Sequence, residues 1–545
     1  MNITSHLFEA FLKCPTKCYL RSLGETGSGN DYADWVRSQN ESCRTDASKR
    51  LLASMPPNEC AAPAPDAATL KTAKWRLAVD VELAAPFREA ERQSRDPGRP
   101  GASQSEISNL KSEMPDPAQV SAGASPSQEP TAKPVLATCL HALERLPAEG
   151  RGKAAQFVPV RFVFRNKLTQ DDRLLLAFDA LVLSQVLERE VSLGKIIHGD
   201  DHATLPANRG RARESVADFQ DPAAEQQTET TTGLTAAALS RAQPQVLKVK
   251  TSALAGEVRK RLEKIATLLS SPTPPDLVLN RHCAECEFQA RCRQKAIEKD
   301  DLSLLARMTE KERKEYRSKG IFTVTQLSYT FRPHRRPKRL RDKREKYHHS
   351  LKALAIRAKK IHIVGSPELK IDGTPVYLDV EGLPDRDFYY LIGVRIGHGE
   401  AAVQHSLWAD TVRDEGKIWR EFLGILETVE KPVLIHYGSY ETTFLKRMGD
   451  SHGRPEGSRV AKAIESAVNA ISVLFAQIYF PTLANGLKDI AHCLGFKWSE
   501  AEPAGLKTII WRNAWEESQP PRLREKLITY NAEDCQALEI LMRAT

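Results

Sequence analysis

The stretch VYLDVEGLP, which begins at Val376, places two acids inside a segment that otherwise has the pattern of a buried strand. Val376, Leu378 and Val380 alternate, so Asp379 and Glu381 fall together on the opposite face. Two like charges on one strand face repel each other unless a positive group lies between them. The pair therefore predicts such a group, together with further ligands from distant parts of the chain.

Two later segments supply candidate ligands. In VLIHYGSYETTF an apolar strand leads into a helix whose first turn carries Glu441. In LITYNAEDCQALEILM, Tyr530 and Asp534 share one helical face with two leucines. An acid on a face suited to burial is costly unless it is paired or bound to metal. The joint pattern predicts a carboxylate cage around divalent cations, made by Asp379, Glu381, Glu441 and Asp534.

These residues resemble the DEDD exonucleases of the DnaQ-like, RNase H-fold superfamily, and more narrowly the YprB-type RNase H-like domain, over residues 361–545. Asp379 and Glu381 match the first motif, and Tyr530 with Asp534 matches the third in its tyrosine version. Glu441 stands where most of the superfamily has Asp. The resemblance implies a 3′→5′ exonuclease. Four carboxylates formally balance two Mg²⁺ or Mn²⁺ ions, which lower the pKa of a water and stabilise the leaving 3′-oxygen.

Two roles near this cage are assigned from chemistry. Tyr530, with an unperturbed pKa near ~10, is a poor base at neutral pH, so we expect it to orient the attacking water. Lys488, in NGLKDIA, is interpreted as a solvated helix lysine, with contact to the substrate as the alternative.

The cysteines predict a second metal site. The start of the chain lacks the regions of a signal peptide, which favours the cytoplasm, where ten cysteines are better read as thiols or metal ligands than as disulfides. Cys283, Cys286 and Cys292 form a C-x₂-C-x₅-C pattern that suits an iron–sulfur or a zinc site. Cys14 or Cys18 is the candidate fourth ligand.

The opening FEAFLKCPTKCYL is similar to that of RecB-type nucleases, including the CRISPR-associated RecB-like exonucleases. The resemblance implies a RecB-type (PD-(D/E)xK-like) nuclease fold for residues 1–299. It also implies a four-iron cluster, with zinc as the alternative and Cys18 in reserve. The cluster ligands would be Cys14, Cys283, Cys286 and Cys292.

The catalytic set of the RecB-type nucleases is not found. The strand FVPVRFVF has Pro159 and Arg161 where an acid-x-Lys should fall. We therefore expect a degenerate nuclease fold kept for binding. The acids and the lysine that could still be recruited are Glu144, Asp179, Glu188 and Lys195.

The remaining segments divide the chain. Residues 93–133 and 206–244 are predicted to be disordered, because they are rich in Pro, Ser, Gln, Thr and Ala and poor in aromatics. Residues 300–330 are predicted to form two short helices around Gly320. Residues 301–327 resemble the helix–hairpin–helix insert of TM-type RecB-like nucleases, with plain connecting helices as the alternative. The last domain is expected to open with a strand and an IDGTP hairpin turn. Strand and helix patterns then alternate, which predicts an α/β fold.

Most of the net charge of +9 is concentrated in one place. In the linker 331–350, RPHRRPKRLRDKREK carries nine Lys/Arg against two acids. Such a run suits contact with a nucleic-acid backbone, although a solvated linker helix is the alternative. The candidate contact residues are Arg335, Arg336, Lys338, Arg339, Arg341, Lys343 and Arg344.

Together these features predict a metal-dependent 3′→5′ exonuclease acting on single-stranded nucleic acid, DNA more than RNA. A helicase or another repair protein is the expected partner. No apolar run reaches transmembrane length, so no membrane contact is expected. Two alternatives remain open. One is an RNase H-like or structure-specific endonuclease using the same cage. The other is a non-catalytic nucleic-acid-binding module of a repair or mobile-element complex.

Overall fold

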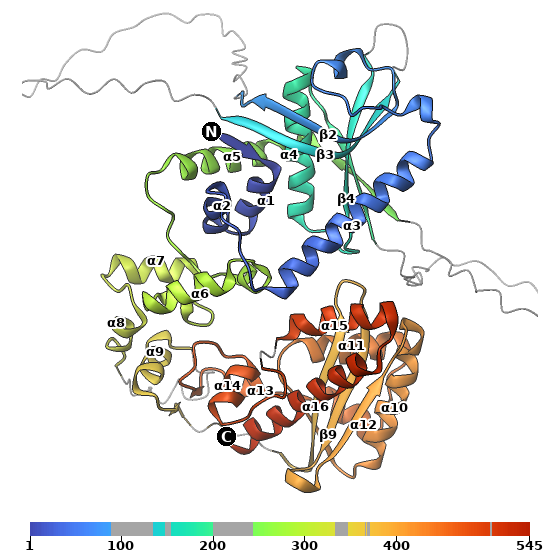
Figure 1. Ribbon diagram of the computed structural model, residues 1–545. Coiled ribbons are helices and arrows are strands. Elements are labelled where there is room, and N and C mark those ends of the chain that lie inside the picture. Colours follow the sequence, from blue (N-terminus) through green and yellow to red (C-terminus); the bar gives the residue numbers. More distant parts are fainter. Residues whose placement is uncertain are drawn as a thin grey trace, which may run out of the picture.

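The computed structural model describes residues 1–88, 134–147, 154–199, 244–332, 347–365, 367, 371–501 and 504–545. An N-terminal unit is built on a six-stranded sheet and a C-terminal unit on a five-stranded sheet, with short connecting helices between them in the sequence (Figure 1). Except for Pro244, the segments predicted to be disordered lie outside the described residues, and so do the seven basic candidates of the linker. Among the described helices, none combines the length and apolar character that a membrane span requires.

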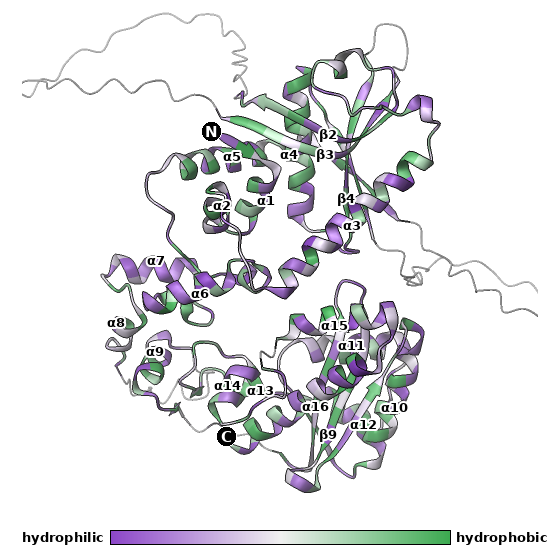
Figure 2. Cartoon of the chain, viewed as in Figure 1, coloured by the Kyte–Doolittle hydropathy of each residue, from purple (hydrophilic) through white to green (hydrophobic). Residues whose placement is uncertain are grey.

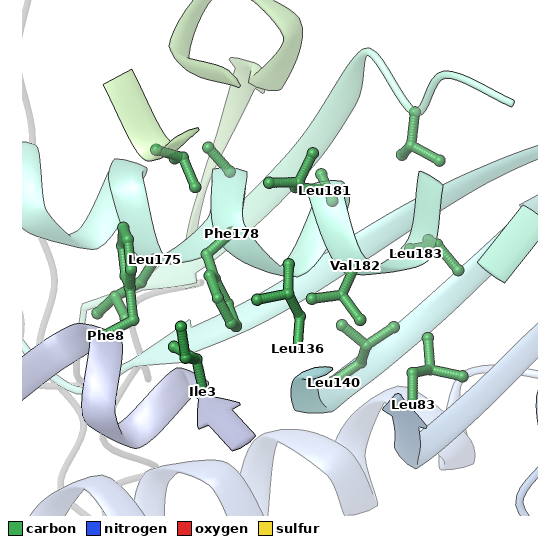
Figure 3. Close-up of a cluster of buried hydrophobic side chains, with 14 of the residues drawn as sticks. Ile3, Phe8, Leu83, Leu136, Leu140, Leu175, Phe178, Leu181, Val182 and Leu183 are labelled. Carbon is green, nitrogen blue, oxygen red and sulfur yellow. The ribbon is translucent and has the colours of Figure 1, made fainter. Parts of the chain in front are cut away.

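The N-terminal sheet has the order β1-β3-β4-β5-β6, and β2 also pairs with β3. Its strands are β1 (Asn2–Thr4), β2 (Leu77–Pro86), β3 (Val135–Leu146), β4 (Gln156–Val163), β5 (Leu193–His198) and β6 (Gln245–Lys250). Helix α4 (Gln170–Leu187) connects the parallel strands β4 and β5. It buries an almost continuous apolar run, and Phe178 stacks on Phe8 with ring centroids 4.9 Å apart (Figure 3). The strand expected for FVPVRFVF is present as β4.

Among the described residues, the further α-helices of the N-terminal unit are α1 (Ser5–Lys13), α2 (Pro15–Ser22), α3 (Asp31–Ala53), α5 (Ala255–Ser270) and α6 (Gln289–Glu298). Thr4 caps α1, because its Oγ1 accepts a hydrogen bond from the Leu7 backbone N–H at 3.2 Å. Helix α5 buries Val258, Leu262 and Ile265, as its apolar spacing predicts. The helical starts and faces follow from local patterns.

The connector contains α7 (Glu310–Ser318), α8 (Val324–Ser328) and α9 (His349–Ala358). The two predicted short helices flank Gly320, whose φ of 76° suits a residue without a Cβ, and α7 is hydrophilic along its length (Figure 2). Lys352 of α9 is buried, and its Nζ donates to the Phe480 carbonyl at 3.0 Å and to Asn485 Oδ1 at 2.7 Å. The connector is therefore fastened to the C-terminal unit.

The C-terminal sheet has the order β10-β9-β8-β11-β12, and an α/β architecture is confirmed. Its strands are β8 (Thr374–Leu383), β9 (Phe388–Ile396), β10 (Val403–Trp408), β11 (Pro432–His436) and β12 (Val468–Asn469). Strands β8 to β10 are antiparallel, and β11 runs parallel to β8 and β12. The helices are α10 (Glu415–Thr428), α11 (Tyr440–His452), α12 (Arg459–Glu465), α13 (Ala470–Leu474), α14 (Leu487–Cys493), α15 (Gly505–Ser518) and α16 (Pro521–Arg543).

The predicted IDGTP hairpin is wrong. Strand β7 (His362–Ile363) pairs antiparallel with β13 (Ile478–Tyr479) and not with β8. The reason is that β8 already has a partner on each side, β9 and β11, so no edge is left for β7. The turn residues are present, but both edges of β8 already pair with other strands.

The turn between β8 and β9 contacts the N-terminal unit. Asp385 accepts hydrogen bonds from the backbone N–H groups of Asn166 and Lys167 at 2.8 and 3.0 Å. The side chain of Lys167 also pairs with Asp387 at 2.7 Å. The two units thus meet close to the strand that carries the acidic pair.

Candidate metal centre

Three carboxylates from two distant elements converge at the middle of the C-terminal sheet. Asp379 and Glu381 point from the same face of β8 and are partly buried, whereas Leu378 and Val380 are buried on the other face. Asp534 extends from α16 and is also buried. Each of the three acids offers an oxygen within 4.8 Å of the other two. Hard oxygen donors at this spacing suit a divalent cation such as Mg²⁺ or Mn²⁺.

A glycine lets α16 approach the sheet this closely. Gly393 of β9 lies directly opposite Asp379, and a Cβ at this position would be 2.1 Å from Asn531 Oδ1 and 2.9 Å from Cys535 Sγ. Asn531 uses the space to donate from Nδ2 to Asp379 Oδ2 at 2.7 Å and to the Asp379 carbonyl at 3.2 Å. The same approach brings Asp534, one helical turn further, to the acidic pair.

The other carboxylate oxygens are held by side chains from α14, α15 and the segment between them. Lys488 Nζ donates to both oxygens of Asp534, at 2.7 and 3.0 Å. Trp498 Nε1 donates to Asp534 Oδ1 at 2.8 Å, and Thr508 Oγ1 donates to Glu381 Oε2 at 2.8 Å. These contacts orient the acids toward their common centre.

The buried carboxylates of the cluster repel one another, so a bound cation would stabilise their ionised forms. Burial raises the pKa of Asp379 well above its usual range, and repulsion from Asp534, Glu381 and Glu441 adds to this effect. Burial and repulsion also raise the pKa of Glu381 to about 8. The pKa of Asp534 is raised by burial although Lys488 opposes the shift. Without a divalent ion the cluster therefore retains a proton at neutral pH, and bound cations would favour the fully ionised form.

Glu441 lies beside this group of three rather than within it. It is 5% exposed, in the first turn of α11, and its charge helps to raise the pKa of Asp379 and Glu381. Its Oε2 has no hydrogen-bond partner among the described residues, and His436 Nδ1 lies 3.6 Å away. A buried carboxylate oxygen without a donor suits a position where a cation binds.

Tyr530 lies one turn before Asp534 on α16 and is 2% exposed. Its hydroxyl has no hydrogen-bond partner in the part of the chain that the structure describes. Burial, and then the neighbouring carboxylates, raise its pKa, so the hydroxyl stays neutral and can donate a hydrogen bond. Lys488 Nζ lies 4.6 Å from the centre of its ring.

Four residues of the centre were missed or misread at the level of sequence. The interpretation of Lys488 as a solvated lysine is wrong, because its ammonium pairs with Asp534 and its side chain is 27% exposed. Trp498, Thr508 and Asn531 were not singled out. Asn531 directly follows Tyr530, so its position beside the predicted ligand helix was the one available signal.

The four candidate thiols of the N-terminal unit line one cavity of about 410 Å³: Cys14, Cys283, Cys286 and Cys292. Burial and mutual repulsion raise the pKa of Cys292 to about 11, with contributions from the other three thiols. Cys18, the reserve ligand, is instead fully buried in the apolar core.

The groups considered for recruitment in the N-terminal unit do not assemble. Asp179 is buried and accepts hydrogen bonds from Thr138 Oγ1 at 2.5 Å and from Arg161 Nε at 3.0 Å. Lys195 pairs with Glu144, and Glu188 ends α4 with an exposed side chain. Among the described residues, Asp379, Glu381 and Asp534 form the one cluster of three or more His, Cys, Asp or Glu side chains whose ligand atoms all lie within 4.8 Å of one another.

The comparisons with known proteins bear on the C-terminal unit. No curated protein matches the chain. Residues 376–545, which run from β8 to the end of the chain and include the three converging carboxylates, match the family model of the RNase H superfamily. This part of the chain is therefore an RNase H-like domain, a nuclease-type fold associated with metal-dependent phosphodiester hydrolysis.

Proposed function

We propose that the protein is a metal-dependent 3′→5′ exonuclease that hydrolyses phosphodiester bonds of single-stranded nucleic acid, with DNA as the preferred substrate. The observation that carries this proposal is the convergence of Asp379, Glu381 and Asp534 on the central strand of an RNase H-like sheet. The spacing of Tyr530 and Asp534 on one helix supports exonuclease rather than endonuclease chemistry, through the resemblance to tyrosine-type DEDD exonucleases.

Two Mg²⁺ or Mn²⁺ ions would be held by the three converging acids, with Glu441 as the fourth ligand. When bound, such ions activate the attacking water and stabilise the leaving oxygen of the phosphodiester. The unpaired Oε2 of Glu441 and the raised pKa values of Asp379 and Glu381 support this assignment.

The surrounding residues orient the acids and the nucleophile. Asn531 and Thr508 hold Asp379 and Glu381 through one hydrogen bond each to a carboxylate oxygen. The free hydroxyl of Tyr530 orients the attacking water, because a neutral phenol donates a hydrogen bond but does not act as a base at neutral pH. Lys488 partly neutralises Asp534.

The N-terminal unit is proposed to bind nucleic acid as a degenerate nuclease fold of the RecB type. The Asp179–Arg161 pair supports this view, because it places a cation beside the acid and leaves no carboxylate cluster for metal in the described part of this unit. Partnership with a helicase or repair protein belongs to the same proposal.

The thiols at Cys14, Cys283, Cys286 and Cys292 are proposed to hold a metal cluster that ties the first helices to the end of the N-terminal unit. All four line one cavity, which supports the set. The resemblance of the opening of the chain to RecB-type nucleases favours a four-iron, four-sulfur cluster, with zinc as the alternative.

The deciding experiment is digestion of 3′- and 5′-labelled single-stranded DNA and RNA with Mg²⁺ or Mn²⁺, using wild type and Asp379→Ala. We expect the wild type to shorten 3′ ends and the variant to lose about 10²-fold or more of the rate. Asp450→Asn is the matched control, because it removes an exposed carboxylate of the same domain.

Three other results would contradict parts of the proposal. Cleavage of a circular single strand would indicate an endonuclease. Equal activity of wild type and Asp379→Ala would place the cutting in the N-terminal unit. Absence of cleavage by the wild type, with retained binding, would leave a binding module.

A further inference from the structure

A second hollow is lined by Lys488 and Trp498, the two residues that donate hydrogen bonds to Asp534. Its volume is about 530 Å³, and it lies along α14 and the segment that follows this helix. This size is within the range of pockets that accept small organic ligands. The lining residues are Lys488, Asp489, His492, Lys497, Trp498, Glu500 and Ala501. We call it the α14 groove.

Two of the residues that line the α14 groove, Lys488 and Trp498, also hold Asp534. Trp498 donates from Nε1 to Asp534 Oδ1 at 2.8 Å and is itself only partly buried, so its indole reaches from the carboxylate to the groove. Lys488 bonds both Asp534 oxygens and lines the groove as well. Anything bound in the groove therefore lies next to a proposed metal ligand.

The groove carries exposed basic side chains beside an indole. Lys497 and His492 are exposed, and neither has an ion pair among the described residues. Of the two acids in the lining, Glu500 is paired with Lys526 at 2.7 Å, and Asp489 lies in the first turn of α14. Basic side chains beside an indole are the combination that binds single-stranded nucleic acid, through phosphate contacts and base stacking.

We propose that the α14 groove is the subsite for the terminal nucleotides of a single-stranded substrate, with a base stacked on Trp498 and a phosphate facing Lys488 and Lys497. This inference rests on the proposed nuclease function. It adds which residues of the same site would recognise the end of the strand. Trp498 then has two tasks: it stacks on the substrate, and it orients Asp534.

The test is binding of a labelled single-stranded oligonucleotide, as DNA and as RNA, measured by fluorescence anisotropy with Ca²⁺ in place of Mg²⁺. Trp498→Leu should weaken binding about tenfold, because the base loses the aromatic face on which it stacks. Trp498→Phe should retain most of the affinity, because phenylalanine keeps a stacking face. The tighter of the two strands names the substrate.

Lys497→Ala supplies a variant that leaves the carboxylates and the fold untouched, because this lysine is exposed. It should weaken binding severalfold and reduce the salt dependence of the affinity by about 0.7 in the log–log slope. Lys462→Ala is the matched control, since Lys462 is an exposed lysine of α12 that does not line the groove, and it should bind as wild type.

Unchanged binding by both Trp498→Leu and Lys497→Ala would overturn the inference, and so would a preference of the wild type for blunt duplex. The nuclease proposal is tested separately, by cleavage rather than by binding. If Asp379→Ala abolishes cleavage while the groove variants bind normally, the nuclease stands and the groove does not. If the groove variants lose binding but no protein cleaves, the groove stands and the nuclease does not.

Discussion

At the scale of single residues, Lys488 places a positive charge beside the carboxylates of the metal centre. Its ammonium forms hydrogen bonds to both oxygens of Asp534, the same oxygens that a divalent ion would use. Removing the lysine would leave the buried acids with less positive charge around them. A bound cation and Lys488 therefore compete for Asp534.

Lys488→Met should accordingly tighten Mn²⁺ binding. We expect about a tenfold lower Kd, which corresponds to ~1.4 kcal/mol and is comparable with one hydrogen bond to a charged group. Isothermal titration calorimetry measures this, with Lys462→Met as the control for loss of a lysine elsewhere in the domain. Weaker binding by Lys488→Met would mean that the lysine holds Asp534 in the geometry that the metal needs.

At the scale of elements, the close packing of α16 on β8 and β9 creates the centre. The bare backbone of Gly393 leaves room for Asn531 and Cys535, and Asn531 in turn bonds Asp379. A wider separation of helix and sheet would move Asp534 away from the acidic pair. The carboxylate spacing is thus a property of the interface between two elements.

Gly393→Ala should destabilise the protein by about 1–3 kcal/mol, because the added methyl overlaps Asn531 and Cys535. It should also weaken Mn²⁺ binding, as α16 is displaced. Thermal unfolding and metal titration measure the two effects. Gly424→Ala is the control: Gly424 is an exposed position of α10 with no atom near a new Cβ, so this change should be neutral or stabilising by up to about 1 kcal/mol. Equal stability of the two variants would contradict the packing argument.

At the scale of the whole molecule, segments that are far apart in the sequence meet around one cavity of the N-terminal unit. Cys14 lies between α1 and α2, whereas Cys286 and its neighbours come shortly before or within α6, at the other end of this unit. A shared metal cluster would join these ends. Burial of the thiols and their mutual repulsion oppose the metal-free arrangement once the thiols ionise.

Purified protein should therefore contain iron, and Cys286→Ser should lose it together with thermal stability. Metal analysis, the visible absorption spectrum and the melting temperature test this expectation. Cys493→Ser, which changes an exposed cysteine outside the group, should keep both. The same metal content in wild type and Cys286→Ser would show that these thiols hold no metal, and one zinc per chain would replace the iron–sulfur assignment.

Periodicity alone was enough to predict the α/β class of the C-terminal unit and the faces on which its acids lie. Asp379 and Glu381 share a face because side chains alternate along a strand, and Tyr530 and Asp534 do so because they are four residues apart on a helix. These relations are local, so they can be read along the chain. Glu441 was placed in the first turn of its helix for the same reason.

Tertiary packing decided what surrounds those acids. Asn531 reaches Asp379 across 152 positions, Thr508 reaches Glu381 across 127, and Lys488 reaches Asp534 across 46. No local period links such residues, and their contacts depend on how α14, α15 and α16 pack on the sheet. The pairing of β7 with β13 was hidden for the same reason, since a turn motif does not reveal which strand edge is free. Sequence determined the direction of the ligands, and packing determined their partners.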